Sequence, residues 1–405
     1  MESYSIPILI LLLGFIIVAG ILIRCGFKKL GIPSLIGFIL LGFLLRLIDT
    51  QKPFLNEQTL DVFELLAQIG LITLLFRVGL ESNLKGLIKQ IRHASLIWVG
   101  NVLFSGVMGV VVAYYLLRLE LIPSLFIGVA LTATSVGISV SVWQERRAIN
   151  SPTGELLIDV AEMDDITGII FMVLLFSAVP VLRGVEGTSL WSSLGHSLGI
   201  LFLKLVAFGV VCVLFSRYVE KHITKFMCGM KHSPDPMLMI AAFGFIIASL
   251  AALLGFSFAL GAFFAGLVFS RDPDAVKLDS SFETLYDFFT PFFFIGIGLS
   301  MNPQSLTPAL GIGLVLLLTA VVGKLIGNAV FSLTVTGWIP SVLISISMVP
   351  RAEIAMVVMQ RGKELGEWAV PEKTFSAMVM VALATSLLAP LILRKGLKKW
   401  PQRSS

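Results

Sequence analysis

The chain has 405 residues, of which 57% are hydrophobic and 14% charged, and its formal net charge is +5. Soluble proteins keep roughly a quarter of their residues charged, so this composition excludes a soluble globular protein and predicts one that spans a lipid bilayer. The positive charge does not indicate nucleic-acid binding, because the basic residues lie between apolar runs rather than in one patch. Three cysteines, Cys25, Cys212 and Cys228, follow neither a metal-binding nor a disulfide spacing.

Apolar runs long enough to cross a bilayer, about 20 residues each, recur along the whole chain. We expect thirteen membrane-spanning helices, at 5–24, 30–48, 61–80, 94–117, 121–144, 154–181, 190–216, 235–254, 256–271, 283–300, 308–336, 340–360 and 374–393. The first run lacks a basic segment before it and is followed by Arg24, so it predicts a membrane helix rather than a signal peptide.

The lysine and arginine residues in the loops predict the orientation of these spans. If the N-terminus lies outside, the inside loops and the C-terminal tail hold nineteen of them and the outside loops hold seven. Cytoplasmic loops carry the excess of basic residues in membrane proteins. The sequence therefore predicts an N-terminus outside and a C-terminus inside.

Four of the predicted spans place polar side chains near the middle of the bilayer. At a rise of 1.5 Å per residue, Asp164 lies about 15 Å into a hydrocarbon core of about 30 Å. The polar residues at this depth are Thr132, Thr134 and Ser135 in 121–144, Asp164 and Asp165 in 154–181, Lys324 in 308–336, and Arg351 and Glu353 in 340–360. Because ionisable residues in membranes mostly mark ion or substrate paths, we expect one shared site rather than ion pairs that only hold helices together.

The adjacent carboxylates Asp164 and Asp165 indicate what that site does. One lysine, Lys324, can neutralise only one of them. The other must be protonated, hold a cation or face water. A carboxylate that alternates between a proton and a cation can exchange one for the other, so the pair predicts cation/proton exchange.

Two of the spans are predicted to be interrupted at the same depth. Pro350 cannot donate to the helical hydrogen-bond ladder, and the hydroxyls of Thr132, Thr134 and Ser135 compete for main-chain groups. Broken helices at corresponding positions of two halves are typical of transporter sites. If spans one to six and eight to thirteen are two six-helix repeats, the interrupted spans correspond, and their offset of seven makes the second repeat inverted.

With these residues in place, the chain resembles the monovalent cation:proton antiporter superfamily. Within it, the chain is similar to bacterial electrogenic sodium/proton antiporters, which are related to the potassium-efflux antiporters. The segments that carry the resemblance include ALTATSVGIS (130–139), AEMDDITG (161–168), VVGKLIGN (321–328) and VPRAEIA (349–355). The departures are Ala352, where related sequences often have glycine, and Arg77, where an apolar residue is usual.

The resemblance implies an all-α sodium/proton antiporter-like fold with crossed broken helices. Core transport helices, 94–181 and 308–393, would move against a scaffold, 5–80 and 235–300, that also forms a homodimer. The segment 190–216 would be a linker helix. The implied location is a bacterial cytoplasmic membrane, and the implied partners are sodium, protons, lipid and a second copy of the chain, with a role in pH homeostasis.

The resemblance also implies roles for the site residues. Asp165 would bind sodium or a proton in competition, while Asp164 pairs with Lys324 when no cation is bound. Thr132, Thr134 and Ser135 would lie at the crossing break, and Arg351 and Glu353 at the partner break. Exchange of two protons for one sodium ion would make transport electrogenic, with sodium held only transiently by Asp164 and Asp165. No enzyme activity, cofactor or nucleic-acid partner is expected.

Three other functions fit parts of the same pattern. Potassium/proton antiport differs only in the ion, and lithium could replace sodium, because carboxylate and hydroxyl oxygens suit all three ions. A sodium-coupled symporter of an organic anion could share inverted repeats and broken helices. An intramembrane aspartyl protease is disfavoured, because neighbouring residues on one helix point about 100° apart and such an enzyme needs two facing carboxylates.

Overall fold

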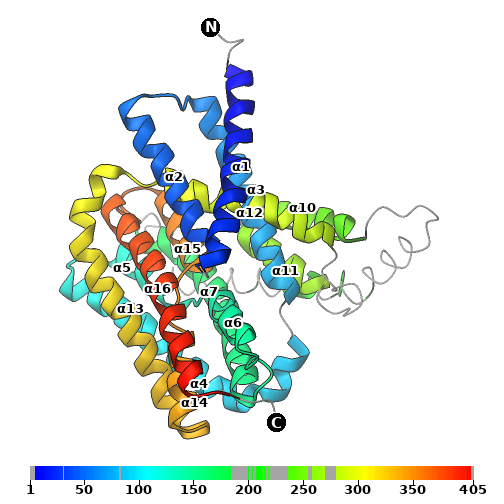
Figure 1. The fold of residues 1–405 in the computed structure, drawn as a ribbon, viewed down its shortest axis with the longest axis vertical. Coiled ribbons are helices and arrows are strands. Elements are labelled where there is room, and N and C mark those ends of the chain that lie inside the picture. Colours follow the sequence, from blue (N-terminus) through cyan, green and yellow to red (C-terminus); the bar gives the residue numbers. More distant parts are fainter. Residues whose placement is uncertain are drawn as a thin grey trace. The chain divides into compact units, whose positions relative to one another are not determined.

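The computed structural model describes residues 5–30, 32–81, 84–183, 236–253, 258–269 and 280–402, with short pieces between 199 and 218. Within these ranges the regular structure is helical and no strand occurs (Figure 1), so the expected all-α class is confirmed. In the described part of the chain, six helices are long and apolar enough to cross a membrane: Leu9–Phe27, Ser34–Gln51, Glu57–Leu80, Ala94–Leu116, Pro303–Val335 and Glu372–Lys399. Large apolar side chains stay exposed on them, such as Phe15 at 74% and Leu314 at 60%, as expected of a lipid-facing surface.

Most predicted spans correspond to one continuous helix. These are α1 (Ser5–Leu30), α2 (Ser34–Gln51), α3 (Glu57–Glu81), α4 (Leu84–Val111), α7 (Pro152–Leu182), α10 (Pro236–Leu253), α11 (Phe258–Phe269), α12 (Ser280–Leu299), α13 (Leu306–Val335) and α16 (Glu372–Lys399). A short π-helix, Val112–Leu116, continues α4. The predicted span 190–216 lies largely outside the described residues, so the total of thirteen stays a prediction.

The two remaining spans are each divided into two half-helices, as predicted. The half-helices are α5 (Leu121–Thr132) and α6 (Val136–Glu145) in the first, and α14 (Trp338–Ser347) and α15 (Glu353–Leu365) in the second. Ala133 takes an extended conformation after α5, with φ −66° and ψ 145°. At the second break, Pro350 removes a donor and disfavours the helical conformation of the residue before it.

The contacts along the chain form two compact units. The first unit comprises Met1–Ser82 and Leu203–Pro303, and the second comprises Asn83–Phe202 and Gln304–Ser405. The first unit therefore contains α1, α2, α3, α10, α11 and α12. The second contains α4 to α7 and α13 to α16, including both broken helices.

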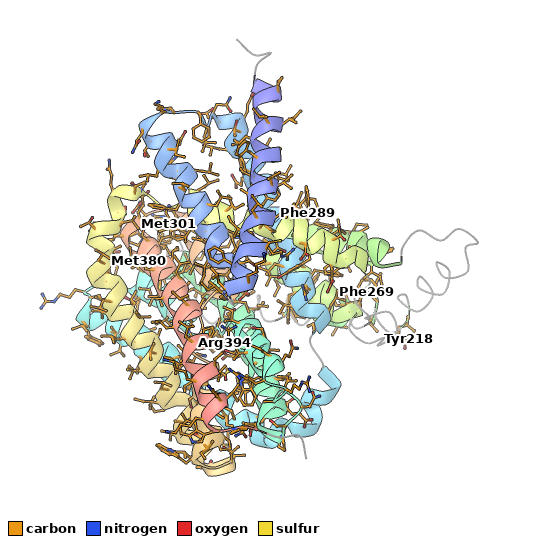
Figure 2. All side chains as sticks on the ribbon, viewed as in Figure 1. Tyr218, Phe269, Phe289, Met301, Met380 and Arg394 are labelled. Atoms are coloured by element: carbon orange, nitrogen blue, oxygen red, sulfur yellow. The ribbon has the colours of Figure 1, made fainter. Side chains whose placement is uncertain are left out.

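Helices of the first unit approach each other closely through glycine. A Cβ atom at Gly42 would lie 2.0 Å from the carbonyl oxygen of Ile295, so α2 and α12 can touch only where no side chain intervenes. Phe269, near the end of α11 (Figure 2), packs edge-on against Phe76 of α3. Arg77, the unusual basic residue of α3, lies with its guanidinium 4.3 Å from the ring centre of Tyr286, a cation–π contact.

The second unit is built around α4 and α13. Helix α4 packs against α13, α5 and α7, while α16 lies beside α13 (Figure 1). A buried apolar cluster joins α4, α6, α7, α14 and α16 through residues that include Ile97, Trp143, Leu157, Ile344 and Leu393. This packing holds α6 and α14, one half-helix of each broken span, against α4, α7 and α16.

Candidate ion-binding site

The centre of the second unit is a buried ion pair. Lys324 of α13 places its Nζ 2.9 Å from Oδ2 of Asp164 on α7, and both side chains are 0% exposed. Removing two charges from water is costly, and their mutual attraction offsets that cost only when further hydrogen bonds complete the pair. Both residues have such partners.

Lys324 also caps the C-terminal end of a half-helix. Its Nζ donates to the main-chain carbonyl of Thr132, the last residue of α5, over 2.6 Å. The carbonyl end of a helix carries partial negative charge, so an ammonium group is favourable there. The Thr132 hydroxyl donates instead to the Val129 carbonyl at 2.7 Å, which means that Thr132 contacts Lys324 through its main chain.

The Asp164 carboxylate accepts hydrogen bonds at both oxygens. The Thr134 hydroxyl donates to Oδ2, the same oxygen that contacts Lys324. Asn101 of α4 donates from Nδ2 to Oδ1 over 2.8 Å. Hydrogen bonds to a charged acceptor are stronger than neutral ones, so these donors fix the orientation of the Asp164 carboxylate beside Lys324.

The two breaks meet and are joined by hydrogen bonds. The main-chain N–H of Ser135, just before α6, donates to the carbonyl of Pro350 over 2.9 Å. The Ser135 hydroxyl donates to the carboxylate of Glu353, the first residue of α15. The half-helices therefore cross at the level of the Asp164–Lys324 pair.

Arg351 lies in the second break and is fully buried. Its Nη1 donates to Thr134 Oγ1 at 3.3 Å and to two carbonyls, Met348 at 3.2 Å and Pro350 at 3.1 Å. Its Nε and Nη2 have no hydrogen-bond partner in the part of the chain that the structure describes. The Arg351 main chain is held by α16, because its N–H donates to Thr385 Oγ1 and its carbonyl accepts from Ser386.

Charges at the crossing match the partial charges of the helix ends. The C-terminal ends of α5 and α14 face the cations Lys324 and Arg351, through the carbonyls of Thr132 and Met348. Glu353 opens α15 and accepts from Ser135 at the start of α6. Cations at carbonyl ends and an anion at amide ends are each stabilising, so all four half-helix ends are compensated.

The structure brings seven of the predicted site residues together. Asp164, Lys324, Thr132 and Thr134 form the ion-pair region, while Ser135, Arg351 and Glu353 join the breaks. The eighth, Asp165, belongs to α7, but its side chain lies outside the described residues.

Sequence reasoning missed several polar partners of the site. Asn101, Asn328, Thr385 and Ser386 were not among its candidate site residues. A signal for Asn328 was present, because it lies four residues after Lys324 and residues at that spacing share one helix face.

The arrangement can exchange one cation for another. Asp164 Oδ2 and the Thr132 carbonyl accept from the Lys324 ammonium, and the Thr134 hydroxyl bonds the same carboxylate oxygen. Oxygens of these types are the ligands that hard cations prefer. An alkali ion could therefore replace the ammonium beside Asp164 without new ligand types.

Comparisons with known proteins agree with this chemistry. The family described as sodium/hydrogen exchanger, transmembrane, matches residues 11–399. The high-affinity Na(+)/H(+) antiporter NhaS3 of Synechocystis is 30% identical over 349 residues, covering 84% of this chain and 73% of the relative. A Na(+)/H(+) antiporter of Enterococcus hirae is 28% identical, covering 92% and 94%.

A solved structure shows the same fold at low sequence identity. The sodium proton antiporter MjNhaP1 of Methanocaldococcus jannaschii aligns over 97% of each chain with a TM-score of 0.70 and 17% identity. The sodium/proton antiporter-like fold expected from the sequence is thereby confirmed. From its match over nearly the whole length, the chain belongs to the transmembrane sodium/hydrogen exchanger family.

Proposed function

We propose that this protein is a secondary active antiporter that exchanges sodium for protons across a membrane. The observation that carries the proposal is the ion pair between Asp164 and Lys324, buried at the crossing of two broken helices. A buried carboxylate that pairs with an ammonium group can exchange this partner for a transported cation, and the ammonium group can then release a proton. The family match and the names of the two antiporter relatives support the same activity.

In the proposed cycle, Asp165 binds either sodium or a proton, and Lys324 holds Asp164 while no cation is present. Arrival of sodium draws Asp164 away from Lys324. The Lys324 ammonium then releases a proton. Two protons for one sodium ion move one net charge per cycle. One charge crossing 100 mV is worth about 2.3 kcal/mol, enough to couple transport to the membrane potential.

The proposal assigns different tasks to the two units. The second unit carries the site and alternates its access by moving against the first unit, which serves as scaffold and as the surface for a homodimer. The family is one of integral membrane proteins, and its bacterial members support a cytoplasmic-membrane location. The excess of basic residues in alternate loops supports an N-terminus outside and a C-terminus inside.

Potassium is the second candidate ion. The names of two less similar relatives include potassium. They are the Na(+)/H(+)-K(+) antiporter GerN of Bacillus cereus and the K(+)/H(+) antiporter subunit KhtU of Bacillus subtilis, each 25% identical. Sodium is favoured because the relatives with the higher identities are named Na(+)/H(+) antiporters.

Transport by purified protein in liposomes tests the proposal. Dissipation of a pH gradient is followed after addition of sodium, lithium or potassium, with and without a membrane potential. We expect sodium to drive proton movement and Asp165→Asn to abolish it, while Glu155→Gln, an exposed change in the first turn of the same helix, leaves it intact. Full sodium-driven proton movement by Asp165→Asn would refute the role of Asp165 as the ion-binding carboxylate. A response to potassium alone would identify potassium, not sodium, as the transported ion.

A further inference from the structure

Two buried asparagines form a chain that ends on the Asp164 carboxylate. Asn328 of α13 donates from Nδ2 to Oδ1 of Asn101 on α4 over 2.9 Å. Asn101 in turn donates from its Nδ2 to Oδ1 of Asp164 over 2.8 Å. Asn328 Nδ2 also donates to the main-chain carbonyl of Lys324 at 2.9 Å, and both asparagines are 0% exposed.

The orientation of these amides is dictated by the two ends of the chain. Asp164 and the Lys324 carbonyl are both acceptors, so each end must receive an N–H group. Asn101 therefore points its nitrogen at Asp164 and its oxygen at Asn328. Exchanging the oxygen and nitrogen positions of the Asn328 amide would place its oxygen against the Lys324 carbonyl. Asn328 therefore uses its amide nitrogen for both contacts, to Asn101 and to the Lys324 carbonyl.

This orientation leaves one acceptor unused. Asn328 Oδ1 is buried and has no hydrogen-bond partner among the residues that the structure describes. Leaving a buried acceptor unpaired is unfavourable. Two amides that only tied α4 to α13 could pair reciprocally and use both oxygens. The observed arrangement gives up that option and supplies a donor to Asp164 instead.

Close approach of the two main chains brings the asparagines within reach. A Cβ atom at Gly327 would lie 2.9 Å from the Gly100 carbonyl oxygen and 3.1 Å from the Asn101 Cα. Only a glycine leaves room for this approach without displacing one helix. Each glycine directly precedes its asparagine in the sequence, so the contact sets the separation of the two amides.

The two oxygens of Asp164 consequently have different environments. Oδ2 accepts from the Lys324 ammonium and the Thr134 hydroxyl, while Oδ1 accepts from the neutral Asn101 amide. Another charged group nearby, Arg351, contacts Thr134 rather than the carboxylate. In the proposed function Oδ2 loses a partner when a cation arrives, whereas nothing in that exchange removes Asn101 from Oδ1.

We infer that Asn101 and Asn328 are positioning residues that anchor Asp164 at Oδ1 while Oδ2 passes between Lys324 and the transported alkali cation. The inference rests on the proposed function. The anchor keeps the carboxylate oriented while its contact with Lys324 breaks, so the incoming cation meets a ligand already in place. A ligand fixed before binding reduces the ordering that binding must impose, which strengthens cation affinity.

The test separates affinity for sodium from turnover in liposomes. Asn101→Leu, which keeps the branched side-chain shape and removes the donor, should raise the KM for sodium about 10-fold, the effect of losing a hydrogen bond to a charged group. Turnover at saturating sodium should stay within about two-fold, because Asp165 and Lys324 are untouched. Asn328→Leu should raise the KM by a smaller factor, since Asn101 can still donate.

Ser105→Ala is the matched control. Ser105 is buried one turn further along α4, and its hydroxyl donates to the main-chain carbonyl of Asn101 rather than to the site. The KM of Ser105→Ala for sodium should equal that of the wild type. A fall in turnover with an unchanged KM in Asn101→Leu would overturn the inference and make the pair a simple interhelical tie.

Two further measurements keep the outcomes distinct. If Asn101→Leu fails to fold, Asn328→Leu decides, since the Asn328 amide donates to Asn101 and to the Lys324 carbonyl rather than to Asp164. A wild-type KM for sodium in Asn328→Leu overturns the inference. Sodium-dependent thermal stabilisation in detergent reports binding without transport. A wild-type protein that responds to no alkali ion in either assay overturns the proposed function and the inference with it. A wild-type response that Asn101→Leu and Asn328→Leu both retain overturns only the inference.

Discussion

Between α5 and α6 the chain carries hydroxyls and no charge, whereas the break between α14 and α15 contains Arg351 and is followed at once by Glu353. The first break takes its cation from another helix, because Lys324 of α13 reaches the Thr132 carbonyl. The second break supplies its own, because Arg351 bonds the carbonyls of Met348 and Pro350 beside it.

The difference separates a displaceable charge from a fixed one. Lys324 contacts the first break through one flexible side chain, so it can leave without unwinding either half-helix. Arg351 is part of the break, and its main chain is held by Thr385 and Ser386 of α16. We therefore expect exchange at the first break and a structural role at the second.

Replacing Lys324 by methionine should have the largest effect on stability. The change leaves Asp164 buried without its cation, and loss of one partner of a buried ion pair costs about 3–5 kcal/mol. Denaturation in detergent at pH 8 measures the difference. Stability equal to that of the wild type would mean that Lys324 does not hold the first break together.

Arg351→Met, the same replacement in the second break, should cost less, about 1–3 kcal/mol. Three hydrogen bonds from Nη1 are lost, but the two guanidinium nitrogens that lack partners in the described chain are removed as well. The same denaturation assay applies. A larger loss than in Lys324→Met would reverse the comparison and place the more important cation in the second break.

Trp143→Phe should have the smallest effect, a loss of about 1 kcal/mol. Trp143 of α6 donates from Nε1 to the Ser347 hydroxyl at the end of α14 over 2.9 Å, away from the ion pair. Ser347 keeps its own bond to the Leu343 carbonyl at 2.7 Å, so no donor is stranded. Sodium transport should be unchanged. A raised KM for sodium would extend the functional site to this contact.

Much of the architecture was predictable because lipid restricts what the chain can do. Apolar runs predicted the spans, and Pro350 with the hydroxyls around Thr134 predicted both breaks. The runs themselves did not reveal half-helices, since 121–144 and 340–360 read as continuous apolar segments. Only the cost of interrupting the hydrogen-bond ladder marked those positions.

The partners within the site were less predictable than its members. Side-chain direction at a crossing depends on how the half-helices pack, so the sequence left the orientation of Arg351 and Glu353 open. The structure shows that Arg351 turns to the carbonyls of Met348 and Pro350, just after α14, and Glu353 to Ser135. Arg77 was unexplained for the same reason, because its contact with Tyr286 joins distant parts of the chain.

The hydrogen bond from the Ser135 N–H to the Pro350 carbonyl uses no side chain. Most substitutions at Ser135 would remove its hydroxyl bond to Glu353 but retain this main-chain donor, so ordinary mutagenesis does not test the main-chain bond by itself. Proline at 135 is the one natural residue that deletes the donor. Chemical replacement of that amide by an ester would delete it without altering either side chain.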